Sequence, residues 1–444
     1  MRAAARRRAI SAETAGGPDD ACTTRPHGGR AVARWQLHGD NALHTGAARD
    51  LPPHDLVFIP AFPPLAAGRP HRAERRRPWR TNDVFPGAWL FARGRFALFE
   101  GLRVLAEVRG VRRIWAPAYL CRPVVDVARA VGLETALYDV DERLEPRWST
   151  VAPIRGDALL ALHYFGLALP RHPLQEFCSA HSMPLVEDCA HAVPDPSATV
   201  QVGYSGALAI FSLRKQAPVP GGGLLVVNDP DLRRVVREPA RSGIGDRRTL
   251  VKLGIMLAER LAFGLGYNVL PYKDRLPVPD AQPEPGAGSS PEAPAAQTEY
   301  SRPPAPAFLL RPMLARLDWR AQIRTRQIAY RRLAARLGAT PGITLPVVTP
   351  PPGSVPQAMP IWVADPDGTA RRLRARGVEA MCWPGQEQVP FPRDACPGTV
   401  AWLDRGLLLP LGCALEPPLL DAMVAAVQEA AGAHATARAP IAVR

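Results

Sequence analysis

The amino-acid sequence predicts an α/β fold with a mainly parallel central sheet, helices on both of its faces, and a smaller C-terminal α/β domain. Two observations lead to this prediction. From about residue 85, short apolar segments alternate with segments of helical periodicity, an order that is typical of parallel sheets. A proline-rich segment then separates this region from a second, shorter mixture of strands and helices.

The larger domain is predicted to occupy residues 81–335. Its first helix is expected at 92–105, where apolar residues recur at helical spacing after Gly94. The segment 250–270 is apolar but contains interspersed charges, so it reads as an amphipathic helix. Further strands are expected at 113–116, 135–140, 158–163, 185–188, 207–212 and 223–227, with helices at 123–131 and 173–181.

The remaining segments are predicted from composition and periodicity. Residues 1–80 form a basic extension that we expect to be disordered, because small, polar and basic residues fill it apart from 56–60. Residues 276–306 are rich in Pro, Ala, Gly, Ser and Glu and are expected to be a mobile insertion. A helical pattern at 309–337 leads into the small domain, 336–435, which has expected strands at 360–363 and 406–410, helices at 370–376 and 418–430, and a tail at 436–444.

The composition is that of a globular protein and limits the possible functions. Of 444 residues, 47% are hydrophobic, and no uncharged apolar run is long enough to span a membrane. The seven cysteines are scattered without CxxC pairs, which favours reduced thiols, a cytoplasmic location and no zinc site. The net charge is +14, and half of it falls in residues 1–80. Because no nucleic-acid-binding motif accompanies this charge, we interpret it as a solvated tail and expect no nucleic-acid partner.

Lys215 is one of three lysines in a chain that has 52 arginines. A lysine amine can be tuned to form a Schiff base at neutral pH, whereas an arginine guanidinium stays protonated. Lys215 follows the strand expected at 207–212, and Asp188 ends the strand before it. Because the carboxyl ends of parallel strands share one edge of the sheet, both side chains are expected in one crevice.

The neighbouring residues suit a site for pyridoxal 5'-phosphate (PLP). The Asp188 carboxylate would pair with a protonated pyridine nitrogen, and His191 would lie against the flat ring. Gly94 precedes a helix, whose free N–H groups suit a phosphate. Each residue alone has a simpler interpretation: Asp188 as a turn residue, His191 as a hydrogen-bonded structural residue and Lys215 as surface charge. Their joint arrangement favours the cofactor.

Three motifs then carry a resemblance to a known family. Residues 187–192 read Glu-Asp-Cys-Ala-His-Ala, Phe211-Ser212 leads to Lys215, and Gly222-Gly223 opens a strand that is followed by Asn228-Asp229. In this order they resemble the motifs of the DegT/DnrJ/EryC1/StrS sugar aminotransferases, which are PLP-dependent transferases of fold type I. Two outer segments support it: residues 162–166, Leu-His-Tyr-Phe-Gly, resemble the family's Val-His-x-Tyr-Gly, and Leu317-Asp318 with Arg326 and Tyr330 resembles its Leu-Asp…Arg…Tyr helix. The resemblance covers about residues 85–435.

The resemblance implies a homodimer that moves an amino group from an amino acid, usually glutamate, to a keto group of a nucleotide-linked sugar, in polysaccharide or secondary-metabolite biosynthesis. It implies that residues 266–268, Gly-Tyr-Asn, are the candidate for a loop that completes the partner's site. The implied roles of single residues are Lys215 as Schiff-base lysine and proton carrier, Asp188 at the pyridinium nitrogen, His191 stacked on the ring, and Gly94, Arg95 and Ser212 at the phosphate.

Two other functions stay open on the sequence. A PLP enzyme of this kind can act on a non-sugar carbonyl or catalyse dehydration or isomerisation. Lys215 favours amino transfer, because some dehydrating relatives carry a histidine in its place. Alternatively, the protein is a non-catalytic regulator on the same fold. Uptake of PLP distinguishes the enzymes from the regulator.

Overall fold

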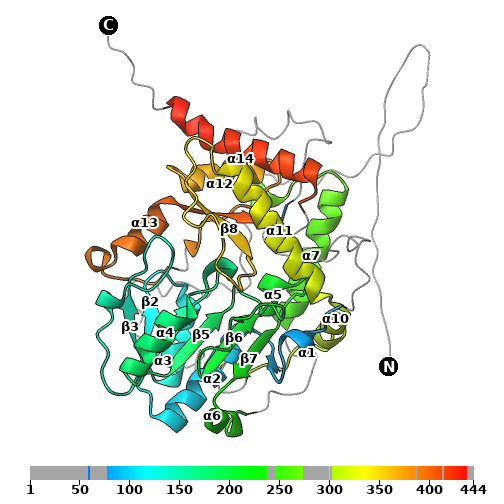
Figure 1. The fold of residues 1–444 in the computed structure, drawn as a ribbon. Helices are drawn as coiled ribbons and strands as arrows, with labels where there is room; N and C mark the ends of the chain where they lie inside the picture. Colours follow the sequence, from blue (N-terminus) through cyan, green and yellow to red (C-terminus); the bar gives the residue numbers. More distant parts are fainter. Residues whose placement is uncertain are drawn as a thin grey trace, which may run out of the picture. The chain divides into compact units, whose positions relative to one another are not determined.

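The structure is a computed structural model that describes residues 59–60, 78–237, 247–273, 300, 303–385, 388–412 and 415–437. All of these residues belong to one unit of the chain, which spans residues 47–444. Figure 1 shows that this unit contains a large central sheet flanked by helices and a second group of helices beside a small sheet. Among the described residues, no helix combines the length and the apolarity needed to cross a bilayer.

A seven-stranded sheet forms the larger part. Its strands are β1 (Trp89–Phe91), β2 (Arg113–Pro117), β3 (Glu134–Tyr138), β4 (Asp157–Leu162), β5 (Leu185–Cys189), β6 (Leu208–Ser212) and β7 (Gly223–Val227). They lie in the order β1-β7-β6-β5-β4-β2-β3. From β6 to β3 neighbouring strands are parallel, whereas β7 runs antiparallel to both β6 and β1. The prediction of a mainly parallel sheet is therefore confirmed.

The sheet buries apolar side chains on both faces, as the alternation along β6 shows. Leu208 and Ile210 lie in the core that contains α2 (Gly94–Arg109) and α3 (Arg122–Val131). Ala209 and Phe211 lie in a different core, with α10 (Leu310–Arg316). Because successive side chains of a strand point to opposite faces, β6 is covered on both sides. Packing of this kind fixes the position of the strand's carboxyl end.

The connecting helices follow the predicted periodicity closely. The amphipathic helix expected at 250–270 is α7, which ends at Gly264, shortly before a left-handed turn at Gly266 (φ 83°). The predicted helix at 173–181 is α4, which begins two residues earlier. The helices of this part are α1 (Thr81–Val84), α4 (Arg171–Ala180), α5 (Leu213–Gln216), α6 (Pro230–Arg234), α7 (Arg247–Gly264) and α8 (Leu270–Lys273).

A second apolar core surrounds a small antiparallel sheet. This sheet pairs β8 (Ala358–Trp362) with β9 (Gly406–Pro410). Side chains from α11 (Trp319–Leu337), α12 (Pro366–Ala375) and α14 (Pro417–Ala437) complete its core, and α13 (Pro397–Arg405) precedes β9. In Figure 1, α11 and α14 lie close to one another on the side of this small sheet. The C-terminal half of α11 thus packs with the small sheet, although the sequence places it at the end of the larger domain.

The structure differs from the sequence-based expectations at several places. The single helical pattern at 309–337 forms two helices, because Leu317 is extended and Asp318 caps α11 by accepting a hydrogen bond from the Ala321 N–H. Strand β1 and helix α13 were not expected. Tyr300, within the predicted mobile insertion 276–306, is buried and stacks on Phe99 with ring centroids 5.3 Å apart; residues 276–299 lie outside the described part of the chain.

Ile59 shows that the predicted N-terminal extension contains a packed residue. Its side chain is completely buried in the core of the small sheet. Its N–H donates to the Gly377 carbonyl at 3.0 Å, and its carbonyl accepts from the Glu379 N–H at 2.9 Å. The rest of residues 1–77, apart from Pro60, lies outside the described residues, as does the predicted tail from residue 438.

Candidate active site

The predicted lysine and histidine meet at the carboxyl edge of the sheet. β5 and β6 are parallel neighbours, with Asp188 paired to Ile210 and Cys189 to Phe211. His191 follows β5, and Lys215 lies in the one-turn helix α5 directly after β6. The Lys215 Nζ is 2.8 Å from the His191 Nε2. The adjacent strand ends therefore bring together two residues that are 24 positions apart in the sequence.

Asp188 is buried beside this pair, with an exposed fraction of 2%. Its Oδ1 accepts a hydrogen bond from the Ala190 N–H at 2.9 Å. Burial raises the pKa of Asp188, while the Ala190 hydrogen bond and the charge of Lys215 act in the opposite direction. A buried carboxylate whose charge is compensated only in part gains stability from a cation placed next to it. This is the property that a partner of a protonated ring nitrogen needs.

His191 is held in its orientation by its backbone and aromatic neighbours. Its Nδ1 faces the Phe165 N–H at 3.4 Å. Its ring is nearly parallel to that of Phe165, at 17° with centroids 5.6 Å apart, and Trp383 approaches it edge-on at 5.4 Å. Burial lowers the pKa of His191 well below its ordinary value, and the charges of Lys215 and Arg214 lower it further. The imidazole is therefore neutral at physiological pH and, because its Nδ1 faces the Phe165 N–H, carries its proton on Nε2, toward the Lys215 Nζ.

Glu187 anchors the end of β5 through a fully used carboxylate. Its Oε1 accepts from the N–H groups of Ser205 and Gly206, both at 2.7 Å. Its Oε2 accepts from the Gly203 N–H at 3.0 Å and lies 3.0 Å from the His163 Nε2. Burial alone would raise the pKa of Glu187, but the hydrogen bonds from His163 and these N–H groups lower it overall. The network fixes the backbone on which Asp188 stands.

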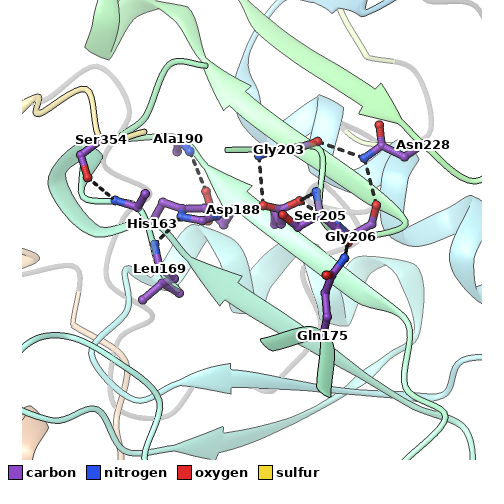
Figure 2. A network of polar contacts seen from close by, with 12 residues as sticks. His163, Leu169, Gln175, Asp188, Ala190, Gly203, Ser205, Gly206, Asn228 and Ser354 are labelled. Carbon is purple, nitrogen blue, oxygen red and sulfur yellow. Dashed lines mark hydrogen bonds and ion pairs between the residues drawn. The ribbon is translucent and has the colours of Figure 1, made fainter. Parts of the chain in front are cut away.

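Figure 2 shows how this network ties the neighbouring loops to the strand. The Leu169 N–H donates to the His163 Nδ1 at 3.1 Å, so that His163 carries its proton on Nε2 and donates it to Glu187. The Asn228 side chain donates to the carbonyls of Gly203 and Gly206, at 3.0 and 2.9 Å. His163, Glu187 and Cys189 also place possible metal-ligand atoms within 4.8 Å of one another. Because four donors already occupy the Glu187 oxygens, we interpret this group as structural.

The residues predicted to bind the phosphate lie near the start of α2. Gly94 is the first residue of α2, and a Cβ on it would lie 3.4 Å from the Ser212 Cβ. A Cβ on Gly223 would lie 2.3–2.4 Å from the Arg93 carbonyl and the Gly94 nitrogen. Glycine is therefore required at residue 223 so that β7 can approach the start of α2. The structure brings Ser212 next to the N-terminus of a 16-residue helix, where an anion is favoured.

Arg95 occupies a different position from the other predicted phosphate residues. Its side chain is half-buried, and its charge acts on Asp126 in α3, where it opposes the rise in the pKa of Asp126 that burial causes. No described contact joins the Arg95 side chain to Ser212. Its backbone, in the first turn of α2, is the part that lies at the predicted phosphate end.

Asn268, in the candidate loop for the partner's site, is bonded within its own chain. Its Nδ2 donates to the carbonyls of Arg374 and Ala375, at 2.8 and 3.1 Å, at the end of α12. Its Oδ1 accepts from the Leu270 N–H. These bonds use both ends of the amide and fasten the chain after α7 to the small-sheet part.

Three further residues lie near the site, and one of them, Trp383, was not identified from the sequence. Phe165 and Trp383 flank His191. Phe165 lies in the segment 162–166, which resembles a family motif, as Arg326 belongs to another, whereas nothing in the sequence places Trp383 there. Arg326 is buried and donates from Nη1 to the Gln216 Oε1, at 2.5 Å, and from Nη2 to the Gln216 carbonyl. The side chain after Lys215 is thus held from α11.

The arrangement fits PLP in three respects that depend on observed contacts. The Lys215 amine contacts the neutral His191. The buried Asp188 carboxylate lies close enough for its charge to interact with Lys215. Glycine at residues 94 and 223 lets the chain pass close to the start of α2, next to Ser212. Such a set can hold an amine-reactive group, stabilise a positive ring nitrogen and bind an anion.

Comparisons with known proteins show which family the central part of the chain resembles. The model of the DegT/DnrJ/EryC1/StrS aminotransferase family matches residues 97–269. The L-glutamine:scyllo-inosose aminotransferase of Streptomyces griseus is 32% identical over 154 residues, which are 33% of this chain and 36% of that protein. The UDP-N-acetyl-3-dehydro-alpha-D-glucosamine 3-aminotranferase of Acidithiobacillus ferrooxidans is 26% identical over 155 residues, 33% of this chain and 41% of that protein. The chain thus matches less than half the length of either relative.

Solved structures show a similar fold over more of the chain. The Helicobacter pylori aminotransferase PseC, involved in the biosynthesis of pseudoaminic acid, superimposes with a TM-score of 0.55 at 13% identity and covers 85% of this chain and 100% of that one. The aminotransferase TlmJ of Streptoalloteichus hindustanus gives a TM-score of 0.51 at 20% identity, covering 78% of this chain and 86% of that one. The fold-type I architecture expected from the sequence is thereby confirmed.

Proposed function

We propose that this chain, whose residues 97–269 match the model of the DegT/DnrJ/EryC1/StrS aminotransferase family, is a PLP-dependent aminotransferase of that family. Its substrates would be an amino acid, with glutamate the first candidate, and a keto group on a nucleotide-linked sugar, within polysaccharide or secondary-metabolite biosynthesis. The observation that carries the proposal is the contact between the Lys215 Nζ and the His191 Nε2 at 2.8 Å. A related protein acts on a UDP-linked sugar, which supports the sugar class.

Each of the residues described above would hold one part of the cofactor. Lys215 would hold it covalently, the Asp188 carboxylate would pair with the ring nitrogen, and His191 would cover one face of the ring. Ser212 and the first N–H groups of α2 would bind the phosphate. When bound, PLP supplies an electron sink for the carbon from which a proton is removed.

The protein's own chemistry in this scheme is the movement of one proton. The Lys215 amine would take the proton from the substrate carbon and return it to a neighbouring carbon. Its contact with His191 is compatible with this role, because the neutral imidazole presents its Nε2–H to the lone pair of an unprotonated amine. Lys215 itself is half-buried, and the His191 ring beside it is buried.

A homodimer is the second part of the proposal. Leu257 and Leu261 lie four positions apart on α7 and are 52% and 65% exposed, and Leu265, just after the helix, is 65% exposed. Apolar side chains gathered on one surface typically mark a protein–protein contact. Leu261→Glu should shift the mass measured by light scattering from dimer to monomer. The matched control is Ile154→Glu, at an exposed apolar residue elsewhere.

The substrate proposal is tested with the pyridoxamine form of the enzyme. This form is mixed with a panel of keto-sugar nucleotides and, separately, with non-sugar keto acids, and return of the PLP absorbance is recorded. We expect a sugar nucleotide to react fastest. Faster reaction with the non-sugar carbonyls would replace the sugar assignment, and a protein that takes up no PLP would be a non-catalytic relative.

A further inference from the structure

Helix α5, which carries Lys215, is too short to fix its own position. It has four residues, Leu213–Gln216, and an isolated helix of this length has no stability in water. The position of the Lys215 amine therefore depends on the contacts that hold the two ends of α5.

The N-terminal end of α5 is held by the glycine turn before β7. The Leu213 N–H donates to the Gly222 carbonyl at 3.0 Å, and the Gly222 N–H donates to the Ala92 carbonyl at 2.8 Å. These bonds tie the start of α5 to the segment that leads into α2. They leave the other end to be fixed separately.

The C-terminal end of α5 is held by Arg326 from α11. The guanidinium donates from Nη1 to the Gln216 side-chain oxygen and from Nη2 to the Gln216 carbonyl. Both residues are almost completely buried, at 2% and 1% exposed. A planar guanidinium that spans two acceptors fixes both direction and distance, and a cation at the last carbonyl of a helix is favourable.

The burial of the Arg326 guanidinium costs more free energy than a purely structural role would justify. Among the described residues it forms no ion pair with a carboxylate, and its Nε lacks a hydrogen-bond partner. Burial lowers its pKa to about 10, so it remains charged at neutral pH. Burying a charge without a partner of opposite charge costs free energy. Stability alone therefore does not explain an arginine here.

We propose that Arg326 is a positioning residue for Lys215, holding the end of α5 through Gln216 so that the lysine amine stays at His191. This inference deepens the proposed function and rests on it for the role of Lys215. Four charged or titratable groups besides Arg326 belong to the Lys215–His191 contact or interact with it through their charge. They are Asp188 from β5, His191 from the loop after β5, and Arg214 and Lys215 on α5.

The test measures the Lys215 amine itself, without cofactor or substrate. The full-length chain is acetylated with trace acetic anhydride across a pH series, and each lysine peptide is quantified by mass spectrometry. Only unprotonated amines react, so the pH midpoint reports each amine. The chain has three lysines, which makes Lys252 and Lys273 internal references.

Arg326→Met should raise the Lys215 midpoint by about half a pH unit or more. Release of α5 takes the amine away from His191 and admits water to it, which favours the ammonium form. Arg326→Lys should rescue the midpoint only in part, because one ammonium cannot span both acceptors. The matched control is Arg324→Met, at an exposed arginine on the same helix, which should leave all three profiles unchanged.

A folded Arg326→Met protein whose Lys215 profile overlays that of the wild type would overturn the proposal. If Arg326→Met does not fold, Gln216→Met decides instead, because it removes the side-chain acceptor and keeps the carbonyl. A smaller upward shift is expected there, and an unchanged Lys215 profile in both Gln216→Met and Arg326→Lys would also overturn it. Failure of PLP uptake would remove the proposed function but leave the acetylation result intact, so the two failures are distinguishable.

Discussion

Replacement of Glu187 by glutamine tests whether the end of β5 depends on a charged carboxylate. The carboxylate accepts four hydrogen bonds, two on each oxygen. A glutamine offers one oxygen and one NH₂ group, so either orientation places a donor against two donors. Hydrogen bonds to a charged group contribute about 1.5–3 kcal/mol each. Loss of two of them predicts that Glu187→Gln lowers the free energy of unfolding by about 3–6 kcal/mol.

The same variant has a predicted pH dependence. The pKa of Glu187 is lowered in the folded protein, below the ordinary value of 4.5. The carboxylate therefore stabilises the fold fully above pH 4.5, and this contribution is lost as the pH falls further. The difference in stability between wild type and Glu187→Gln should be complete at pH 7.5 and become smaller as the pH is lowered below 4.5.

Urea unfolding followed by circular dichroism at these pH values measures the difference directly. The control is Glu142→Gln, on an exposed turn, which should change the free energy of unfolding by less than about 0.5 kcal/mol. The reasoning is refuted if Glu187→Gln unfolds within about 1 kcal/mol of wild type at pH 7.5, or if the difference does not vary with pH.

Three further predictions concern the site and its support. Lys215→Arg should bind PLP only non-covalently and lose turnover by about 10²-fold to 10⁴-fold or more, because a guanidinium is no proton carrier at neutral pH; near-normal turnover would contradict the assignment. Gly223→Ala should cost about 1–3 kcal/mol in urea unfolding and weaken PLP binding, whereas Gly254→Ala, with open space around it, should not weaken binding. Ile59→Ala should destabilise the protein by about 2–5 kcal/mol, and deletion of residues 1–75 should do so at least as much, whereas unchanged stability would show that Ile59 packing is dispensable.

The proximity of Asp188, His191 and Lys215 was predictable because they follow neighbouring parallel strands. Asp188 and Lys215 are each placed by the end of a strand, and parallel strands put those ends at one edge. The lysine was conspicuous because so few others occur. The contact between Arg326 and Gln216 could not be predicted, since the two residues are 110 positions apart and neither has a local pattern that indicates its partner.

Segment composition did not predict the burial of single apolar side chains in otherwise polar segments. Ile59 lies in a segment dominated by polar and basic residues, yet it completes a bridge beside Val378. Tyr300 is similar, because a single aromatic ring reaches α2 from a Pro- and Ala-rich segment. Average composition describes the behaviour of a whole segment, whereas burial of one side chain depends on the residues elsewhere in the chain that pack against it.

The most direct test of the account is to locate the covalent attachment of PLP. The full-length protein is incubated with PLP, reduced with borohydride and digested, and the lysine peptides are analysed by mass spectrometry. The account predicts one phosphopyridoxyl group per chain, on Lys215, and none on Lys252 or Lys273. A protein that is modified at the other two lysines, or that takes up no PLP, would contradict it.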